Sequence, residues 1–268
     1  MLSSLRFLRI IKKNPDRRAF CTALVPAAGN SSRMGANAEN KLLMDLDGAP
    51  VLARTLTALQ LSRRVDEIVI AAREQDLEPV SRICADYHIK KCENIIVGGE
   101  TRAESVLRAA MAASRNAAFF AVHDGARPLI TPDLIDRTIE AAIKYGAAAP
   151  AIPMKDTIKK IRKNENPDQK QGNQNNNNIQ SVSGTLNRDL LRAIQTPQAF
   201  DADLLKAALQ SAAKNKISIT DDCSAVEKLG KTVYLIPGDE ENIKLTTPLD
   251  FIFARAILEK RKNPEAYI

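Results

Sequence analysis

A short glycine- and serine-rich stretch near the start of the chain, 25–35, has residue types that bind phosphate. The apolar run 21–26 has the length of a strand, and the small residues that follow it leave backbone N–H groups exposed. Arg33 adds a planar, permanently charged guanidinium, and Lys41 adds a compact ammonium. The stretch therefore predicts a loop that grips a polyphosphate.

An ordinary turn between a strand and a helix, carrying two solvated cations, explains the same residues. No Gly-Lys-Ser/Thr follows the loop, as it would in a P-loop, and the Gly-x-Gly-x-x-Gly pattern of dinucleotide sites is missing. The loop gains a functional meaning only if other loops of suitable chemistry meet it.

A second candidate is the segment 98–105, where a predicted strand gives way to a predicted helix. Its two glycines let the backbone approach a flat ligand, and Glu100 and Ser105 offer hydrogen bonds to the edge of a base. A capping turn, with Thr101 as the N-cap and Glu104 at the third helical position, accounts for the same residues without a ligand.

A third candidate is the segment 123–128, His-Asp-Gly-Ala-Arg-Pro, which also ends a predicted strand. Asp124 suits a ribose hydroxyl or the coordination shell of Mg²⁺, and Arg127 suits a phosphate. A local ion pair between these two residues in a tight turn is the alternative. We expect His123 to pack rather than to take part in the chemistry.

Five later fragments place a polar side chain next to a turn or within an apolar run. Four of them, none specific alone, are 155–159, 187–188, 195–198 and 219–222. The fifth contains Lys244 within a predicted strand, where an unpaired cation would be costly. Lys244 should therefore have an anion beside it.

Short apolar runs alternate with longer segments of helical period from Thr22 onward, which predicts an α/β fold with a doubly wound, mostly parallel sheet. The predicted strands are 21–26, 67–71, 94–97, 119–122, 147–152, 232–236 and 243–245. The predicted helices are 51–61, 75–87, 102–114, 132–145, 204–213, 224–229 and 249–260. Right-handed crossovers would bring the loops after Ala27, Val97 and Val122 to one edge of the sheet, which makes that edge the candidate site.

A β-arm at about 154–188 is predicted to project from the sheet, with strands at 156–161 and 179–183. It is interrupted at 163–178, where most residues are Asn or Gln and none is a large apolar side chain, so a flexible insert is expected. Such an arm more often mediates dimerisation or covers a site than forms a separate domain. We therefore expect a basic N-terminal extension, 1–20, followed by one domain, 21–268.

Charge and composition argue against nucleic-acid binding and against membrane insertion. Most of the formal net charge of +7 lies in residues 1–20, and the chain has four Tyr, seven Phe and no Trp with which to stack bases. No apolar stretch approaches the roughly 20 residues that span a bilayer. With two His, four Cys and no Cys-x-x-Cys pair, we expect reduced thiols and no His-based metal site.

Residues 1–20 mix basic and apolar side chains, which fits either an extension or an organellar transit peptide. We expect a bacterial-type extension and a cytoplasmic protein. A plastid location is the alternative if 1–20 belongs to a transit peptide.

Taken in order, the motifs resemble those of the 2-C-methyl-D-erythritol 4-phosphate cytidylyltransferases of the non-mevalonate isoprenoid pathway, a family with a Rossmann-like nucleotidyltransferase fold. The resemblance runs from about Cys21 to the C-terminus, apart from the insert. It is carried by Ala-Ala-Gly at 27–29, Arg-Met-Gly at 33–35 with Lys41, Gly-Gly-Glu-Thr-Arg-Ala-Glu-Ser at 98–105, His-Asp-Gly-Ala-Arg-Pro at 123–128, Asp-Thr-Ile-Lys at 156–159, Gln-Thr-Pro-Gln at 195–198, Thr-Asp-Asp at 220–222 and Asn-Ile-Lys at 242–244.

The resemblance implies that CMP passes from CTP to a polyol phosphate, 2-C-methyl-D-erythritol 4-phosphate, with release of pyrophosphate. It also implies Mg²⁺ or another divalent cation bound mainly through the CTP phosphates, and a homodimer in which some arm residues serve the partner's site. The implied contacts are, for cytidine, Ala27, Ala28, Gly29, Asn30, Gly99, Glu100 and Ser105; for the ribose and the metal, Asp124; for the triphosphate, Arg33, Lys41 and Lys244; and for the acceptor, Gly125, Arg127, Thr157, Arg188, Thr196 and Thr220.

These residue types suit the reaction, because a phosphate monoester, with a second pKa of about 6, is largely dianionic near neutral pH and attacks phosphorus without a general base. The protein must align two anions and stabilise the charge that develops as pyrophosphate leaves. One departure from the family pattern is Asn-Lys-Leu at 40–42, where relatives often carry Pro-Lys-Gln.

Two other functions remain open from the sequence. A ribitol-5-phosphate cytidylyltransferase resembles this family in fold and reaction, although Asp-Gly-Ala-Arg-Pro at 124–128 and Arg-Ala-Glu-Ser at 102–105 favour methylerythritol phosphate as the acceptor. A nucleotide-binding relative without activity is the other, although an inert scaffold has no use for so many converging cations.

Overall fold

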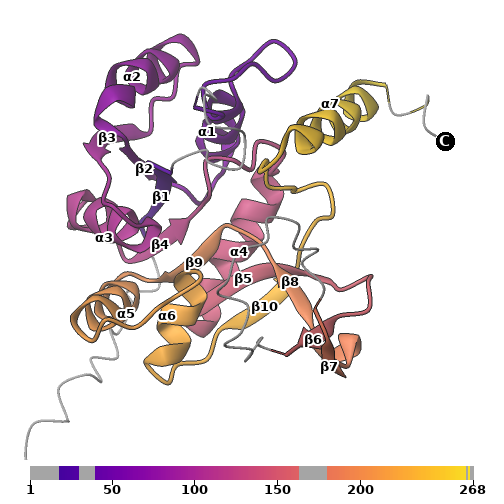
Figure 1. Cartoon of the computed structure of the whole chain (residues 1–268). Coiled ribbons are helices and arrows are strands. Elements are labelled where there is room, and N and C mark those ends of the chain that lie inside the picture. Colours follow the sequence, from indigo (N-terminus) through magenta and orange to yellow (C-terminus); the bar gives the residue numbers. More distant parts are fainter. Residues whose placement is uncertain (1–17, 30–39, 163–179, 264, 266–268) are drawn as a thin grey trace, which may run out of the picture.

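A mixed sheet at the centre of the molecule carries the loops of interest (Figure 1). The computed structural model describes residues 18–29, 40–162, 180–263 and 265. Within these residues the sheet has eight strands, in the order β10-β5-β9-β4-β1-β2-β3, with β8 paired to β5. Their bounds are β1 Cys21–Ala27, β2 Glu67–Ala72, β3 Cys92–Val97, β4 Phe119–Val122, β5 Ala147–Pro153, β8 Arg192–Ile194, β9 Gln198–Asp201 and β10 Tyr234–Pro237.

Parallel pairing dominates the sheet, as predicted. Strand β1 pairs in parallel with β2 and β4, β2 with β3, and β5 with β10. The exceptions are β9, which is antiparallel to β4 and β5, and β8, which is antiparallel to β5. Neither β8 nor β9 was among the predicted strands. Because Gln198 at the start of β9 is opposite Val122 at the end of β4, the residues that enter β9 lie at the edge where β4 ends.

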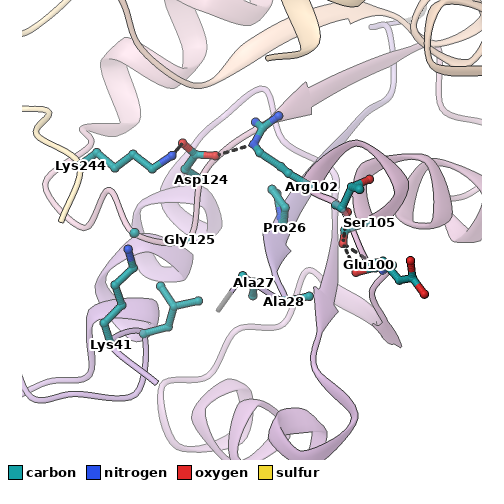
Figure 2. Close-up of a pocket in the computed structure, with 15 residues that line it drawn as sticks. Pro26, Ala27, Ala28, Lys41, Glu100, Arg102, Ser105, Asp124, Gly125 and Lys244 are labelled. Carbon is teal, nitrogen blue, oxygen red and sulfur yellow. Dashed lines mark hydrogen bonds and ion pairs between the residues drawn. The ribbon is translucent and has the colours of Figure 1, made fainter. Parts of the chain in front are cut away.

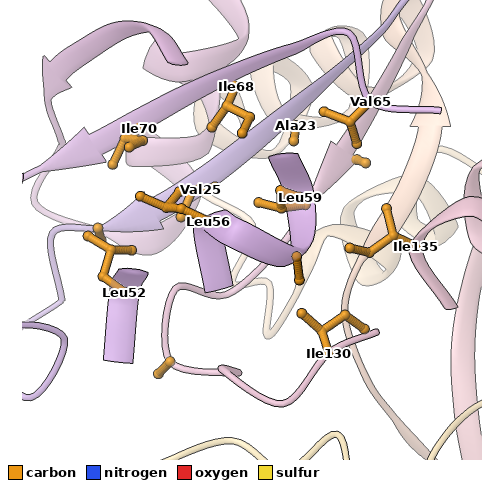
Figure 3. Close-up of a cluster of buried hydrophobic side chains, with 14 of the residues drawn as sticks. Ala23, Val25, Leu52, Leu56, Leu59, Val65, Ile68, Ile70, Ile130 and Ile135 are labelled. Carbon is orange, nitrogen blue, oxygen red and sulfur yellow. The ribbon is translucent and has the colours of Figure 1, made fainter. Parts of the chain in front are cut away.

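Helices cover both faces of the sheet (Figure 1). Figure 3 shows part of the first hydrophobic cluster, in which Leu56 and Leu59 of α1 lie near Val25 of β1. The preceding residue of β1, Leu24, is buried in the second cluster, because successive strand residues point to opposite faces. The helices of the first cluster are α1 Val51–Leu61, α2 Leu77–Asp86, α4 Pro132–Tyr145 and α7 Pro248–Lys262; those of the second are α3 Arg102–Ala112, α5 Ala202–Lys214 and α6 Asp222–Lys228.

The predicted bounds of α1, β4 and α4 are confirmed, and the other predicted helices overlap the observed ones. Helix α4 shows why the ends of a helix could be predicted from the sequence. The Thr131 side chain accepts a hydrogen bond from the Leu134 N–H, Pro132 occupies the first turn, and Gly146 ends the helix at φ +89°. Each of these signals is local in the sequence.

The predicted strand at 243–245 is wrong. This segment has no regular secondary structure and is held by contacts with two other loops. The Leu245 N–H donates to the carbonyl of Ala126 at 2.8 Å, and the side-chain amide of Asn242 donates to the carbonyl of Thr196 at 3.0 Å. The apolar run at 243–245 therefore reflects burial within a loop rather than pairing in a sheet.

The predicted arm contains a two-stranded antiparallel sheet of β6 (Lys159–Ile161) and β7 (Val182–Thr185). A hairpin pairing is confirmed, but both of its strands begin about three residues later than predicted. The insert 163–178 lies outside the described residues. Beyond β7 a short 3₁₀ helix, η4 (Arg188–Leu190), leads to β8. The arm lies at the β8 end of the molecule and exposes apolar side chains, namely Ile161, Val182, Leu186 and Leu190.

The described helices and the four cysteines bear on membrane insertion and on thiol chemistry. Among the residues that the structure describes, none of the helices combines the length and apolar character needed to cross a bilayer. All four cysteines are free thiols, and Cys21 and Cys223 are buried. Burial raises the pKa of both buried thiols, so they are protonated packing residues rather than nucleophiles.

Candidate active site

The loops at the carboxyl ends of β1, β3 and β4 enclose a pocket (Figure 2). The β1 loop contributes 26–29, the β3 loop contributes 99–102 with Ser105, and the β4 loop contributes 124–126. Lys41, Leu42 and Lys244 complete the lining. The structure thus brings together the three loops that the βα alternation predicted, although Lys244 comes from the far end of the chain.

The β1 and β3 loops touch each other because Gly98 has no side chain. A Cβ atom at Gly98 would lie 2.5 Å from the Cβ of Ala28 and 2.9 Å from the Oγ of Ser105, closer than atoms can pack. The Gly98 N–H donates to the carbonyl of Ala72 at 2.8 Å, which anchors this turn to the end of β2. Glycine at this position therefore closes the wall of the pocket.

Ser105 shapes the β3 loop from inside the pocket wall. It is buried, and its hydroxyl accepts a hydrogen bond from the Gly99 N–H at 3.0 Å and donates to the carbonyl of Thr101 at 3.0 Å. The capping turn weighed in the sequence analysis is also present, since Thr101 accepts from the Glu104 N–H at 3.1 Å. Capping and pocket formation are thus both properties of this segment.

Asp124 lies at the centre of an ion-pair network on the opposite wall. Its Oδ2 is 2.7 Å from Lys244 Nζ and its Oδ1 is 3.1 Å from Arg102 Nε. Burial alone would raise the pKa of Asp124, but the charges of Arg102 and Lys244 outweigh burial and hold that pKa well below its usual value. Lys244 has the anionic partner that its apolar surroundings required, and Asp124 is ionised.

Arg102 joins Asp124 to a second, fully buried carboxylate, Asp222, at 2.7 Å. Burial raises the pKa of Asp222, and Arg102 opposes that shift. Burial would lower the pKa of Arg102, but both carboxylates outweigh it and raise that pKa. Removing Arg102 should therefore cost about 3–5 kcal/mol, because the buried carboxylate of Asp222 would lose its charged partner.

Arg102 lies within the Gly-Gly-Glu-Thr-Arg-Ala-Glu-Ser motif, but no role in the site was predicted for it. The available signal was a cation in the first turn of a helix that follows a Gly-Gly turn, in a chain with two further motifs that each offer an aspartate. Its partners lie 22 and 120 residues away, so spacing alone could not pair them.

Behind the Asp124 wall, a hydrogen-bonded cluster links the β4 loop to the segment that enters β9. The Thr196 hydroxyl accepts from the Asp124 N–H at 3.1 Å and lies 3.0 Å from His123 Nδ1. Arg127 donates to the carbonyl of Asn242 at 2.6 Å, next to the segment that carries Lys244. Burial lowers the pKa of Arg127 and lowers that of His123 to about 4, so the imidazole is neutral near pH 7.

The sequence-predicted residues fall into three groups. Those that line the pocket are Ala27, Ala28, Gly29, Lys41, Gly99, Glu100, Ser105, Asp124, Gly125 and Lys244. Those outside its lining are Arg127 and Thr196, which lie directly behind it, Thr157 and Arg188 on the exposed arm, and the exposed Thr220 before α6. Asn30 and Arg33 lie outside the described residues.

The described residues contain no group of three or more His, Cys, Asp or Glu side chains placed to hold a metal ion. At its charged end the pocket instead offers the ionised carboxylate of Asp124, held between two cations. Such a donor fits a hard cation that brings most of its oxygen ligands with it, as a cation bound to a polyphosphate does.

Comparison with known proteins assigns this geometry to a family. The family model described as 2-C-methyl-D-erythritol 4-phosphate cytidylyltransferase matches residues 21–260. The chain is 38% identical over 242 residues to the protein of that name from Halalkalibacterium halodurans, covering 90% of this chain and 98% of the relative. It is 37% identical to the one from Thermosynechococcus vestitus, covering 90% and 97%.

Solved structures agree with the sequence relatives. The crystal structure of 4-diphosphocytidyl-2C-methyl-D-erythritol synthase from Anaerococcus prevotii has a TM-score of 0.74 and 29% identity, and the match covers 91% of this chain and 100% of that chain. The crystal structure of 2-C-methyl-D-erythritol 4-phosphate cytidylyltransferase from Thermus thermophilus has a TM-score of 0.68 and 29% identity, with coverage of 90% and 99%.

Proposed function

Because the chain belongs to the family of 2-C-methyl-D-erythritol 4-phosphate cytidylyltransferases, we propose that the pocket at the carboxyl edge of its sheet is where it binds CTP. The chain is a nucleotidyltransferase that transfers CMP from CTP to 2-C-methyl-D-erythritol 4-phosphate, giving 4-diphosphocytidyl-2-C-methyl-D-erythritol and pyrophosphate. The observation that carries the placement is the convergence of Lys41, Asp124 and Lys244 on one pocket.

The cytidine would lie between the β1 and β3 loops. Ala27, Ala28 and Gly29 present backbone groups without large side chains, and the Gly99–Glu100 turn lies next to them in the lining of the pocket. The bond from the Gly99 N–H to Ser105 holds this turn in place without a ligand, which reduces the entropy lost on binding. Narrow walls of backbone suit a flat pyrimidine ring.

The ribose and the triphosphate would occupy the charged end of the pocket. The ionised carboxylate of Asp124 accepts hydrogen bonds from ribose hydroxyls, and Lys244 and Lys41 provide positive charge on two sides of the pocket. Arg33, which follows β1 in the sequence, would add a guanidinium to the phosphates. These cations replace the water that would otherwise stabilise the anionic ligand.

We propose that Mg²⁺ or another divalent cation accompanies CTP, with Asp124 as its protein ligand and phosphate oxygens as most of the others. When bound, the cation neutralises charge on the triphosphate and on departing pyrophosphate. The residues of the chain orient the nucleotide and exclude water from the reacting phosphate.

The acceptor phosphate would bind on the side of the pocket formed by the β4 loop, where Thr196 bonds to the backbone of Asp124 and Arg127 bonds to the carbonyl of Asn242. Its monoester is a dianion above its second pKa of about 6, so it attacks the α-phosphorus without a general base. The bond from that phosphorus to pyrophosphate breaks as the new P–O bond forms. The contribution of the protein is therefore alignment and charge stabilisation.

We also propose a homodimer in which the arm supplies Thr157 and Arg188 to the acceptor site of the partner. Both residues lie on the exposed arm, outside the lining of the pocket in their own chain, and the arm exposes apolar side chains. The bacterial relatives support a cytoplasmic location for the reaction, with a plastid as the alternative if residues 1–20 form a transit peptide.

The test is an assay of pyrophosphate release with CTP, Mg²⁺ and either 2-C-methyl-D-erythritol 4-phosphate or ribitol 5-phosphate. We expect turnover with the first acceptor, and Lys41→Ala or Arg33→Ala should lower it roughly a hundredfold, since each removes a charge that stabilises the transition state. Near-normal turnover in both variants would refute the proposed triphosphate site. A preference for ribitol 5-phosphate would overturn the acceptor, and CTP binding without turnover would indicate an inactive relative.

A further inference from the structure

Lys41 lies in a turn that the preceding residue, Asn40, closes with two hydrogen bonds. The backbone carbonyl of Asn40 accepts a hydrogen bond from the Leu43 N–H at 2.8 Å. Its side-chain oxygen accepts one from the Leu42 N–H at 3.2 Å. The N–H groups of Leu42 and Leu43, the two residues after Lys41, are thus both bonded to Asn40, so the direction in which the Lys41 stem leaves the chain depends on Asn40.

Asn40 is itself held by a buried ion pair at the end of β2. Its side-chain amide donates to Asp76 Oδ2 at 2.8 Å, and Asn40 and Asp76 are only 6% and 5% exposed. Arg73, the residue directly after β2, contacts both oxygens of Asp76, with Nε 2.5 Å from Oδ2 and a terminal nitrogen 3.2 Å from Oδ1. This two-point contact leaves the Asp76 carboxylate in one orientation.

The other side of the turn is bonded to α1 and lies near the β4 loop. The carbonyl of Leu42 accepts a hydrogen bond from the Leu52 N–H at 2.9 Å. The Leu42 side chain is buried 3.5 Å from the point where a Cβ of Gly125 would lie. The turn is thus fixed between β2, α1 and the β4 loop, and Figure 2 shows Lys41 extending from it into the pocket.

We propose that Asn40, held by the Asp76–Arg73 pair, is a positioning residue that directs Lys41 toward the phosphates of CTP. The inference rests on the proposed function, in which Lys41 stabilises the triphosphate. Lysine has a long flexible stem, so its charge acts at a defined point only when its backbone is fixed. A displacement of about 1 Å in a reacting group can cost about a hundredfold in rate.

The experiment is a double-mutant cycle on the full-length enzyme, measuring kcat and KM for CTP with methylerythritol phosphate as the acceptor. We expect Asn40→Ala to lower kcat/KM by about ten- to a hundredfold when Lys41 is present. In a Lys41→Ala background the same change should alter kcat/KM by less than about twofold, because no ammonium remains to be misplaced.

A purely structural role for Asn40 predicts a different result, since a loosened turn would lower kcat/KM equally in both backgrounds. That outcome, or wild-type activity in Asn40→Ala, overturns the positioning role and leaves the proposed function intact. If Lys41→Ala itself is fully active, the triphosphate role of Lys41 fails instead. The two failures are therefore distinguishable.

A second pair of variants keeps the proposal testable if Asn40→Ala does not fold. Asn40→Asp retains an acceptor for the Leu42 N–H but places a carboxylate against Asp76, so it should lower kcat/KM as well. Adding Asp76→Asn restores one amide and one carboxylate at the contact and should recover at least about tenfold. Failure of this rescue contradicts the proposal.

Arg82→Ala, which breaks an exposed ion pair with Glu78 on α2, is the matched control and should leave kcat/KM unchanged.

Discussion

His123 is a buried histidine whose surroundings in the fold favour the neutral imidazole. Its side chain has no exposure, its Nδ1 lies 3.0 Å from the Thr196 hydroxyl, and its Nε2 lies 3.4 Å from the carbonyl of Arg127. A carbonyl can only accept, so Nε2 carries the proton and Nδ1 is an acceptor. Protonation at Nδ1 would place a second cation next to Arg127.

The depressed pKa of His123 predicts that stability falls on acidification. Burial lowers this pKa to about 4, below the value of 6.5 expected for an exposed histidine, so between these values the unfolded chain binds the additional proton. The free energy of unfolding should therefore drop by about 2 kcal/mol from pH 7 to pH 5 on account of this residue. Urea unfolding at both pH values measures it.

The control for this prediction is the other histidine, His88, which is exposed and has a φ of +52° that Asn tolerates. His123→Gln should flatten the pH dependence, whereas His88→Asn should retain the wild-type slope. The raised pKa of Asp222 acts with the opposite sign and is common to all three proteins, so it cancels in the comparison. Equal slopes for His123→Gln and wild type would contradict the assignment.

Single residues were predictable where their chemistry was unusual for their surroundings. Lys244 in an apolar run indicated a nearby anion, and the structure supplies Asp124. The role of Asn40 was not predictable, because its partner Asp76 lies 36 residues away and an Asn before a Lys has no signature of its own. Sequence spacing identifies candidate groups, but folding decides which of them meet.

The turn between β3 and α3 allows a test at the level of elements. Gly98→Ala would place a Cβ 2.5 Å from the Cβ of Ala28, and neither group can rotate away. The β1 loop must then shift, so the KM for CTP should rise by about tenfold or more. Steady-state kinetics at varied CTP concentration measures this change.

Two further variants establish the cause of this effect. Gly184→Ala in β7 adds the same methyl group where nothing lies within 4 Å, so it should leave the KM for CTP unchanged. Adding Ala28→Gly to Gly98→Ala removes the closest clash and should restore part of the affinity. A Gly98→Ala enzyme with wild-type KM would show that the two loops do not form one wall of the site.

Elements with local signals were predicted well, and those defined by pairing were not. Capping residues and proline marked α4, whereas β8 has only three residues and β9 only four. Their side chains follow no long alternation, and the strands are defined by their partners, β5 for β8 and both β4 and β5 for β9. The segment 243–245 shows the converse, an apolar run whose backbone bonds to a loop.

The exposed leucines of the arm allow a prediction of the oligomeric state of the molecule. Leu190 is 81% exposed and Leu186 is 43% exposed, which suits burial against a second copy of the chain. Leu186→Lys with Leu190→Lys should convert a dimer to a monomer in sedimentation. Activity should fall with it, because Thr157 and Arg188 would no longer reach a partner's acceptor site.

An exposed leucine far from the arm provides the control. Leu61, at the end of α1, is 65% exposed. Leu61→Lys should change neither the oligomeric state measured by sedimentation nor the activity. A wild-type protein that sediments as a monomer at assay concentration, with full activity, would refute the dimer and the role of the arm in it.

The extension at 1–20 and the single domain at 21–268 stay predictions.

The reversed direction of β9 has a practical consequence for altering this enzyme. Its entry residues, Gln195 to Pro197, reach the active edge beside the β4 loop, while the cytidine contacts we propose come from the ends of β1 and β3. In the proposed site the nucleotide and the acceptor would thus be contacted largely by different stretches of the chain, joined where Thr196 bonds to the backbone of Asp124. We therefore expect a different strand entry between β8 and β9, with Thr196 retained, to change which polyol phosphate is accepted more than it changes recognition of the nucleotide donor.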